Sequence, residues 1–325
     1  MTYYPGSTDE SAAAPILVAS GDRVDADLTL HAVPAVHLTV HSAPGSGGEE
    51  QDPRLPHLSQ LIFGSEEVRV YGAVLVGPPE SHISEFAGIA PGHYIVRESD
   101  SPRTMETEAT GNQEVDLAAG TPVGGVVLTV RTSDASPLPA SLRMTLLSDD
   151  AVRRTLLSSH TDKPTFRFNS VPPGRWIVLA ETGNTAVAVS SIAIGAETHA
   201  DSRIVVKDRP VVATATLAQG KTNIEGFVTK NGKGEAGVMV VLVPRDPAAN
   251  LEFFRRDQSD SDGSFVMVQA VPGDYKIIAI EDGWELDWAR PEVIARYLQG
   301  SVPVTVTAKS GASIHLSTDV VVRPR

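Results

Sequence analysis

Ile89–Val96 reads IAPGHYIV, Val171–Val178 reads VPPGRWIV and Ala270–Ile277 reads AVPGDYKI. In each stretch a Pro-Gly pair is followed, two residues after the glycine, by an aromatic residue. Proline fixes φ and glycine accepts the positive φ of a tight turn, so each pair predicts a corner that leads into a strand. The glycines are 82 and 99 residues apart, about one small sandwich domain each. The repeat therefore predicts a row of similar β domains.

Aromatic residues accompany each corner. Side chains alternate along a strand, so the aromatic residue and the residue two positions later share one face. A phenylalanine also lies upstream of each corner. We expect these aromatics to anchor three hydrophobic cores; a sugar-stacking platform is the alternative. The six expected anchors are Phe86, Tyr94, Phe168, Trp176, Phe265 and Tyr275.

The rest of the chain is dominated by short β-branched runs with period two. Val126–Val130 reads VVLTV and Val302–Val306 reads VPVTV. Runs of this kind, bounded by Gly, Pro, Asp or Ser at short spacing, are typical of sandwiches rather than of βαβ units. We therefore predict an all-β fold of tandem transthyretin-like or Ig-like β-sandwich domains.

A second pattern marks the ends of domains: an apolar alternation, a glycine, a polar stretch and a last strand. It occurs four times, over 16–30, 115–130, 192–206 and 304–322. Four endings and three corners predict that residues 1–32 are the closing strands of an incomplete β domain. Sandwiches are then expected over 33–121, 122–216 and 217–325. Unpaired strands in residues 1–32 would either fold back on the next domain or pair with a neighbouring molecule.

Composition excludes several classes of function. The net charge of −13 argues against nucleic acid and anionic membranes as partners, because phosphate binding needs a basic face. With no cysteine, disulfides, thiolate metal sites and a cysteine nucleophile are excluded. No apolar stretch approaches the ~20 residues of a membrane span, and the residues after Met1 do not show the charged-then-apolar pattern expected of a signal peptide. We expect this chain to belong to a longer exported protein.

The last domain carries a family resemblance. Ile224–Val228 reads IEGFV, Gly234–Leu242 reads GEAGVMVVL, and Ser259–Phe265 reads SDSDGSF before the Pro-Gly corner. This order resembles the carboxypeptidase regulatory-like domain, a transthyretin-like sandwich. The likeness is strongest over 221–282 and weaker over 123–210 and 33–120. It implies a multi-domain exported protein of acidobacterial type and a non-catalytic accessory role.

Catalytic and metal-binding signatures are missing from the sequence. There is no H-E-x-x-H, no G-x-S-x-G and no phosphate-binding loop. Asp257, Asp260 and Asp262 resemble part of a calcium loop, but the closing acidic position is absent. An Asp-Gly turn between strands is the simpler interpretation.

Aromatic residues, scarce elsewhere, gather in the last domain. A short helix or turn is expected over 246–256, and a second short helix beginning near Pro291. One interpretation is that this second helix covers an end of the last sandwich, with two tryptophans beneath it. The other is a ligand groove for a glycan or peptide. Its residues would be Phe253, Phe254, Arg255, Arg256, Trp284, Trp288 and Tyr297.

The sequence thus predicts a non-enzymatic structural or interaction protein of the bacterial cell surface or periplasm, without a cofactor. Protein partners are expected, including the chain itself as a homo-oligomer or filament formed through residues 1–32. A glycan- or peptide-binding module is the second hypothesis. An accessory region of a larger receptor or enzyme is the third.

Overall fold

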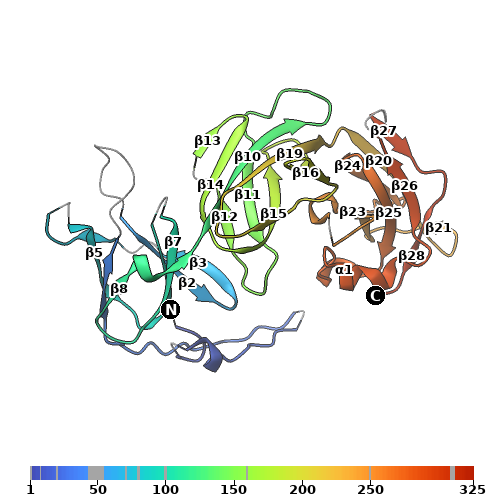
Figure 1. Ribbon diagram of the computed structural model, residues 1–325. Coiled ribbons are helices and arrows are strands. Elements are labelled where there is room, and N and C mark those ends of the chain that lie inside the picture. Colours follow the sequence, from blue (N-terminus) through green and yellow to red (C-terminus); the bar gives the residue numbers. More distant parts are fainter. Residues whose placement is uncertain are drawn as a thin grey trace.

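The computed structural model describes residues 2–7, 9–19, 21–42, 55–69, 72–78, 81–98, 101–158, 160–248, 250–307 and 312–325. Three β-sandwiches follow one another along the chain, and Figure 1 shows them as an arched row coloured from blue through green to red. We call them domain 1 (36–122), domain 2 (124–219) and domain 3 (222–323). The predicted all-β fold of tandem sandwiches is confirmed.

Domain 1 has two sheets, with strand orders β4-β5-β1-β8 and β3-β2-β6-β7-β9. Its strands are β1 (Val36–His41), β2 (His57–Ile62), β3 (Ser65–Arg69), β4 (Val74–Leu75), β5 (Ile83–Ile89), β6 (Gly92–Arg97), β7 (Arg103–Ala109), β8 (Gln113–Asp116) and β9 (Thr121–Pro122). A 3-10 turn, η3 (Leu117–Ala119), lies between the last two strands.

Domain 2 repeats this plan with sheets β13-β14-β10-β19-β16-β17 and β12-β11-β15-β18. Its strands are β10 (Gly124–Thr132), β11 (Arg143–Ser148), β12 (Thr155–Leu157), β13 (His160–Asp162), β14 (Thr165–Val171), β15 (Gly174–Glu181), β16 (Val187–Ile194), β17 (Glu197–His199), β18 (Arg203–Val206) and β19 (Val211–Gln219).

In domain 3 the two layers form one continuous sheet, because β28 pairs in parallel with both β20 and β25. Its strands are β20 (Thr222–Lys230), β21 (Lys233–Gly234), β22 (Met239–Pro244), β23 (Arg255–Gln258), β24 (Ser264–Ala270), β25 (Gly273–Ile280), β26 (Val302–Val306), β27 (Ser313–His315) and β28 (Val320–Arg323). Its helical pieces are η4 (Leu251–Phe253), η5 (Gly283–Glu285), α1 (Pro291–Ile294) and η6 (Ala295–Tyr297). The helix predicted to begin near Pro291 is confirmed.

All three domains share one pairing scheme. The first strand pairs antiparallel with the strand before the Pro-Gly corner, as β1 does with β5, β10 with β14 and β20 with β24. It pairs in parallel with a late strand, as β1 does with β8, β10 with β19 and β20 with β27. The corner strands β6, β15 and β25 are therefore equivalent elements.

The six predicted anchors are buried between the sheets of their own domains. Each is at most 3% exposed and packs in its domain's hydrophobic cluster. The corner aromatics also satisfy their polar atoms locally. Tyr94 Oη donates to Ala90 O at 2.7 Å, Trp176 Nε1 to Pro172 O at 3.0 Å and Tyr275 Oη to Val271 O at 2.6 Å. Each corner is thus closed by the same hydrogen bond, to the carbonyl four residues upstream.

A β-bulge precedes each corner at an equivalent position. The bulge residues are Gly88, Ser170 and Gln269, with φ values of 72°, 54° and 53°. At each of them the strand before the corner has one residue more than the first strand with which it pairs. Counted from the corner, Phe86 and Phe168 are equivalent to Met267, and Phe265 is equivalent to Phe166. The upstream phenylalanine thus occupies two different core positions.

The connection that follows the corner strand differs most among the domains. It is short in domain 1, residues 98–102. In domain 2 it spans 182–202 and forms the β16–β17 hairpin, which extends a sheet. In domain 3 it spans 281–301 and contains η5, α1 and η6.

Residues 13–35 contain no strand wherever the structure describes them, so the strands expected over 16–18 and 28–30 are absent there. They run out and back as a dark blue arm in Figure 1. No ladder partner holds these apolar runs, and their large side chains are exposed: Ile16, Leu17, Val18, Val24, Leu28, Leu30 and Val33. The fourth predicted domain ending includes residues 308–311, which lie outside the described residues.

Candidate functional site

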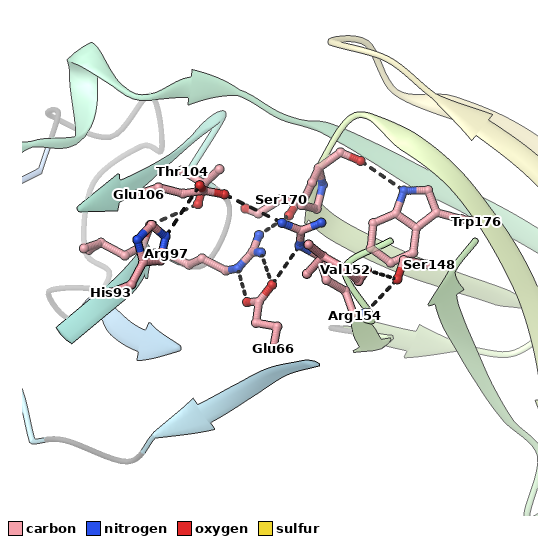
Figure 2. A network of polar contacts seen from close by, with 12 residues as sticks. Glu66, His93, Arg97, Thr104, Glu106, Ser148, Val152, Arg154, Ser170 and Trp176 are labelled. Carbon is pink, nitrogen blue, oxygen red and sulfur yellow. Dashed lines mark hydrogen bonds and ion pairs between the residues drawn. The ribbon is translucent and has the colours of Figure 1, made fainter. Parts of the chain in front are cut away.

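The junction between domains 1 and 2 is built around the carboxylate of Glu66 on β3. Arg97 of β6 makes two hydrogen bonds to it, Nε to Oε1 at 3.0 Å and Nη2 to Oε2 at 2.8 Å. Arg154 of domain 2 donates from Nε to the same Oε2 at 3.0 Å. The side chains of Glu66 and Arg97 are each 6% exposed. Figure 2 shows Glu66 between the two guanidinium groups: the two-point pairing with Arg97 orients the carboxylate within domain 1, and Arg154 binds it from domain 2.

Backbone contacts reinforce this junction. Glu66 N–H donates to Arg153 O at 2.8 Å, and Arg153 N–H donates to Gly64 O at 2.7 Å. Ser65 and Arg153 form a parallel bridge. The domain 2 loop 149–154 therefore pairs with the start of β3.

The bulge of domain 2 supplies a further contact. Ser170 Oγ donates to Ser101 O at 2.8 Å, and Arg97 Nη1 donates to Ser170 O at 3.3 Å. Inside domain 2, Arg154 N–H donates to Ser148 Oγ at 2.6 Å, which orders the loop carrying the second guanidinium. The bulge residue thus reaches the connection after the corner strand of the preceding domain.

Electrostatics favour an ionised acid at this junction. Burial acts to raise the pKa of Glu66, but the charge and hydrogen bonds of Arg97, with help from Arg154, hold that pKa below its usual value. Burial and the charge of Arg97 lower the pKa of the neighbouring His57. A carboxylate bound by two guanidinium groups is a poor proton acceptor, so the arrangement fits a structural role and not a general base.

The junction between domains 2 and 3 uses a different acid. Glu252 of η4 accepts Ala180 N–H at 2.7 Å and Val189 N–H at 3.1 Å, one on each carboxylate oxygen. Ala180 belongs to β15 and Val189 to β16, so one carboxylate contacts both sheets of domain 2. Burial raises the pKa of Glu252 to about 7, although the two N–H groups act to lower it.

The bulge of domain 3 also contacts the preceding domain. Gln269 accepts Ala186 N–H at 2.7 Å and donates to Asn184 O at 3.3 Å. In the linker, Gly220 N–H donates to Ala186 O at 2.8 Å. A Cβ on Gly220 would lie 1.9 Å from Gln269 O, so only glycine fits there. Arg203 of β18 contacts the loop 245–254 through a hydrogen bond to Ala248 O.

The two junctions follow one plan. In each, the bulge residue of the later domain contacts the connection after the corner strand of the earlier one. In each, the loop after the second long strand of the later domain, 149–154 or 245–254, supplies the second contact. These side-chain contacts form the best-defined polar sites of the described residues.

The structure divides the predicted aromatic set between the two faces of the layer formed by β22, β23, β25 and β26 in domain 3. Phe253 packs in the core between the layers, with its ring centroid 6.4 Å from that of Tyr275. Phe254 lies on the opposite face, 6.1 Å from Trp288. Arg255 donates to Glu252 O and Phe254 O, both at 2.7 Å. These residues do not converge on one groove.

A smaller exposed group remains from that set. The guanidinium carbon of Arg256 lies 5.6 Å from the ring centroid of Trp284 and 5.1 Å from that of Trp288. Trp284 is 41% exposed and donates to Gly237 O at 3.2 Å. Tyr297 is partly buried beneath the same segment. The helix thus covers an outer sheet face, where an end of the sandwich was expected.

The three aspartates of the calcium candidate accept hydrogen bonds from backbone N–H groups in this structure. Asp257 accepts Val266 N–H at 2.8 Å and Asp262 accepts Ser264 N–H at 2.9 Å. Asp260 O accepts Gly263 N–H at 2.9 Å, as in a turn. Nowhere in the described ranges do three or more His, Cys, Asp or Glu side chains form a group that could hold a metal ion.

Sequence reasoning did not identify the junction residues. Arg97 ends the otherwise apolar run Tyr94–Val96, and Glu252 stands in the apolar run Leu251–Phe254. A charge inside a buried strand or beside buried aromatics is the available signal for a paired polar site. Their partners lie tens of residues away, so no local spacing connects them.

Comparison with known proteins gives one family match. Residues 220–308 match the family described as BOS complex subunit NOMO1-like, second beta sandwich domain. The match agrees with the sandwich fold of domain 3; the carboxypeptidase regulatory-like type stays a prediction. No curated protein sequence matches the chain.

Solved structures give distant likenesses. A streptococcal ancillary pilin is 14% identical, with 90% of this chain and 100% of that chain covered and a TM-score of 0.30. GBS52, the minor pilin of Streptococcus agalactiae, is 11% identical, with coverages of 62% and 97% and a TM-score of 0.28. BcpA, the major pilin subunit of Bacillus cereus, is 11% identical, with coverages of 89% and 98% and a TM-score of 0.23. Likeness this distant carries no information on function.

Among the helices that the structure describes, none has the length and apolar character that a membrane crossing needs.

Proposed function

We propose that this chain is a non-catalytic scaffold that holds three sandwich domains at fixed relative positions. The observation that carries the proposal is the junction at Glu66, where a buried Glu66–Arg97 pair of domain 1 is bound from domain 2 by the guanidinium of Arg154 and by Ser170 O. Flexible linkers need no such contact. The second junction, at Glu252 and Gln269, supports the same role. An exported setting, at the cell surface or in the periplasm, belongs to the proposal and rests on the resemblance of residues 221–282.

Distance measurements between spin labels test this proposal. The chain has no cysteine, so exposed residues can be labelled in pairs without background. Thr110→Cys with Thr198→Cys spans the first junction, and Thr198→Cys with Lys233→Cys spans the second. We expect one narrow distance distribution for each pair, and Glu66→Ala should broaden only the first. Broad distributions in the otherwise unaltered chain would exclude a rigid scaffold.

Self-assembly is a finer part of the proposal. The arm 13–35 exposes seven large apolar side chains and has no strand partner among the described residues. Segments of this kind add readily to a free sheet edge of another molecule. By light scattering, the intact chain should have a mass above that of one chain, and the variant without residues 1–32 should have the mass of a single chain. A single-chain mass both with and without these residues would contradict this part alone.

A ligand-binding role is the second candidate, because Trp284 is exposed beside the stacked guanidinium of Arg256. Stacking on an exposed indole is a common way to bind a sugar ring or a peptide side chain. Screening oligosaccharides and peptides by tryptophan fluorescence, with Trp284→Ala and Trp288→Ala as variants, tests it. A signal that survives both substitutions would place the ligand elsewhere.

A further inference from the structure

In every domain the strand that brings the chain in lies beside, and parallel to, a strand near the point where the chain leaves. Domain 2 has the longest such pair: β10 and β19 are in register over seven residue pairs, from Val126–Val211 to Thr132–Leu217. Domain 1 pairs β1 with β8 over four residues, and domain 3 pairs β20 with β27 over three and with β28 over two. The chain therefore enters and leaves each sandwich through neighbouring parallel strands.

Parallel pairing places the two ends of a domain at opposite ends of this strand pair. In domain 2 the chain enters at Gly124, the start of β10, and leaves at Gln219, the end of β19. At about 3.3 Å per residue, the seven pairs separate these ends by about 20 Å along the strands. A pull on the two ends therefore acts along the strands in opposite directions. Such a pull loads the evenly spaced hydrogen bonds of the parallel ladder together, whereas a pull across the strands would break them one after another.

The β10–β19 pair of domain 2 is central in its sheet and partly buried. β10 also pairs with β14, and β19 with β16, so neither strand lies at the edge. On the outer face Arg131 Nε donates to Thr216 Oγ1 at 3.2 Å, across a registered pair. The core side chains and this side-chain hydrogen bond thus oppose sliding of one strand past the other. The inward side chains of both strands are at most 3% exposed and belong to the core: Val126, Leu128, Val130, Ala213, Ala215 and Leu217.

Short linkers connect the strand pair of one domain to that of the next. Only Val123 separates β9 from β10, and only Gly220 and Lys221 separate β19 from β20. Both linkers are held by backbone hydrogen bonds, since Val123 N–H donates to Pro102 O and Gly220 N–H donates to Ala186 O, each at 2.8 Å. A pull along the row of domains therefore reaches each parallel ladder directly and is not taken up by a long linker.

We infer that the chain bears tension along the row of domains, and that domain 2 is its strongest element. The ladder in domain 1 is shorter, and β8 lies at the edge of its sheet. The ladder in domain 3 is divided between β27 and β28. Domain 2 should therefore unfold at the highest force of the three. This function goes beyond that of a rigid scaffold, because it depends on strand pairing inside each domain and not on the junctions at Glu66 and Glu252.

Pulling domain 2 in two directions tests this inference in the full chain. Because the chain lacks cysteine, the handles of an optical-tweezers experiment can be attached at exposed residues changed to cysteine. Thr121→Cys with Lys221→Cys pulls the β10–β19 pair from its opposite ends. The control, Thr121→Cys with Asp208→Cys, pulls from one end, where a Cβ on Gly124 would lie 2.4 Å from Lys207 O. We expect the first variant to unfold at a force higher by about twofold or more, because its ladder bonds must break together.

Pulling the whole row compares the three domains. Handles at Ala35→Cys and Pro324→Cys load all of them, and a glycine-serine insertion after Gly195, in an exposed turn, lengthens the extension step of domain 2 alone. We expect the lengthened step to come last, at the highest force.

Two outcomes would overturn the inference. The first is an equal unfolding force for domain 2 in the two pulling directions. The second is a lengthened step that precedes either of the other two when the whole row is pulled. Failure of the scaffold proposal would appear separately, as broad label distances in the unaltered chain without any applied force.

Discussion

The two junctions bury one acid each, and the two acids behave in opposite ways. Glu66 lies between Arg97 and Arg154, whose positive charges outweigh its burial and lower its pKa. Glu252 accepts two backbone N–H groups and lies near the charge of Arg255, but burial outweighs them and raises its pKa to about 7. The fold places a buried carboxylate at both junctions. The neighbouring side chains decide whether that carboxylate is charged.

Opposite pKa shifts predict opposite pH dependences. A lowered pKa in the folded state means that Glu66 contributes stability above its ordinary value of 4.5, and that this is lost as pH falls through the lowered pKa. A raised pKa means that the stability at Glu252 is complete below 4.5 and is lost as pH rises through about 7. We therefore expect both junctions to hold near pH 5, with acid weakening the first and base the second.

The largest expected effect comes from Glu66→Ala. The change leaves Arg97 buried without its acid partner, and breaking a buried ion pair from one side costs about 3–5 kcal/mol. Urea unfolding followed by hydrogen exchange in β3 and β6 should show a loss of this size. Arg143→Ala, at a pair whose side chains are 75% and 52% exposed, is the control and should cost less than about 1 kcal/mol. Equal losses in the two variants would mean that the junction contributes nothing beyond a surface pair.

Next in size is the pH dependence at Glu252. Glu252→Gln keeps an oxygen for a backbone N–H and removes the charge. Since the rise from 4.5 to about 7 corresponds to about 3 kcal/mol, the variant should gain up to this amount above pH 7 relative to the unaltered chain. Thermal unfolding between pH 5 and pH 8 should show a decline in the unaltered chain that is smaller in the variant. An unchanged slope would place the titrating group elsewhere.

The contrast between corners and junctions explains what could be predicted from sequence. Tyr94, Trp176 and Tyr275 stand at fixed distances from a Pro-Gly pair, so a local pattern was enough to predict three buried joints. Glu66 and Arg154 are 88 residues apart in sequence, and their pairing depends on how two complete domains meet. No local period encodes such a contact.

The aromatic set of domain 3 shows a second limit. Phe253 and Phe254 are neighbours in sequence, yet Phe253 ends the 3-10 turn η4 and Phe254 has an extended backbone before β23, and their side chains join different clusters. Phe253 joins the inter-sheet core, and Phe254 joins the cluster under residues 283–298. Composition revealed that the aromatics gather in this domain, but only the structure showed that two buried clusters share them.

The corners provide a smaller and more uniform test. Tyr94→Phe and Tyr275→Phe each remove one hydroxyl and leave a carbonyl, Ala90 O or Val271 O, without that donor. A lost buried hydrogen bond costs about 1–2 kcal/mol, and the equivalent geometry predicts nearly equal losses in domains 1 and 3. Denaturant unfolding of both variants measures this. A cost confined to one domain would mean that the shared corner is not a shared source of stability.

The smallest expected effects come from the bulge residues, and they compare the two junctions directly. Ser170→Ala removes a hydroxyl that donates to Ser101 O, and its cost should be about 0.5–1 kcal/mol. Gln269→Ala removes both an acceptor for Ala186 N–H and a donor to Asn184 O, so its cost should be the larger of the two. Hydrogen exchange of the Ala186 amide is the sensitive measurement, because Gln269→Ala removes the acceptor of that N–H at the domain boundary. If Ser170→Ala proved the more costly change, the charged network around Glu66 would depend on the bulge, and the two junctions would differ in plan as well as in charge.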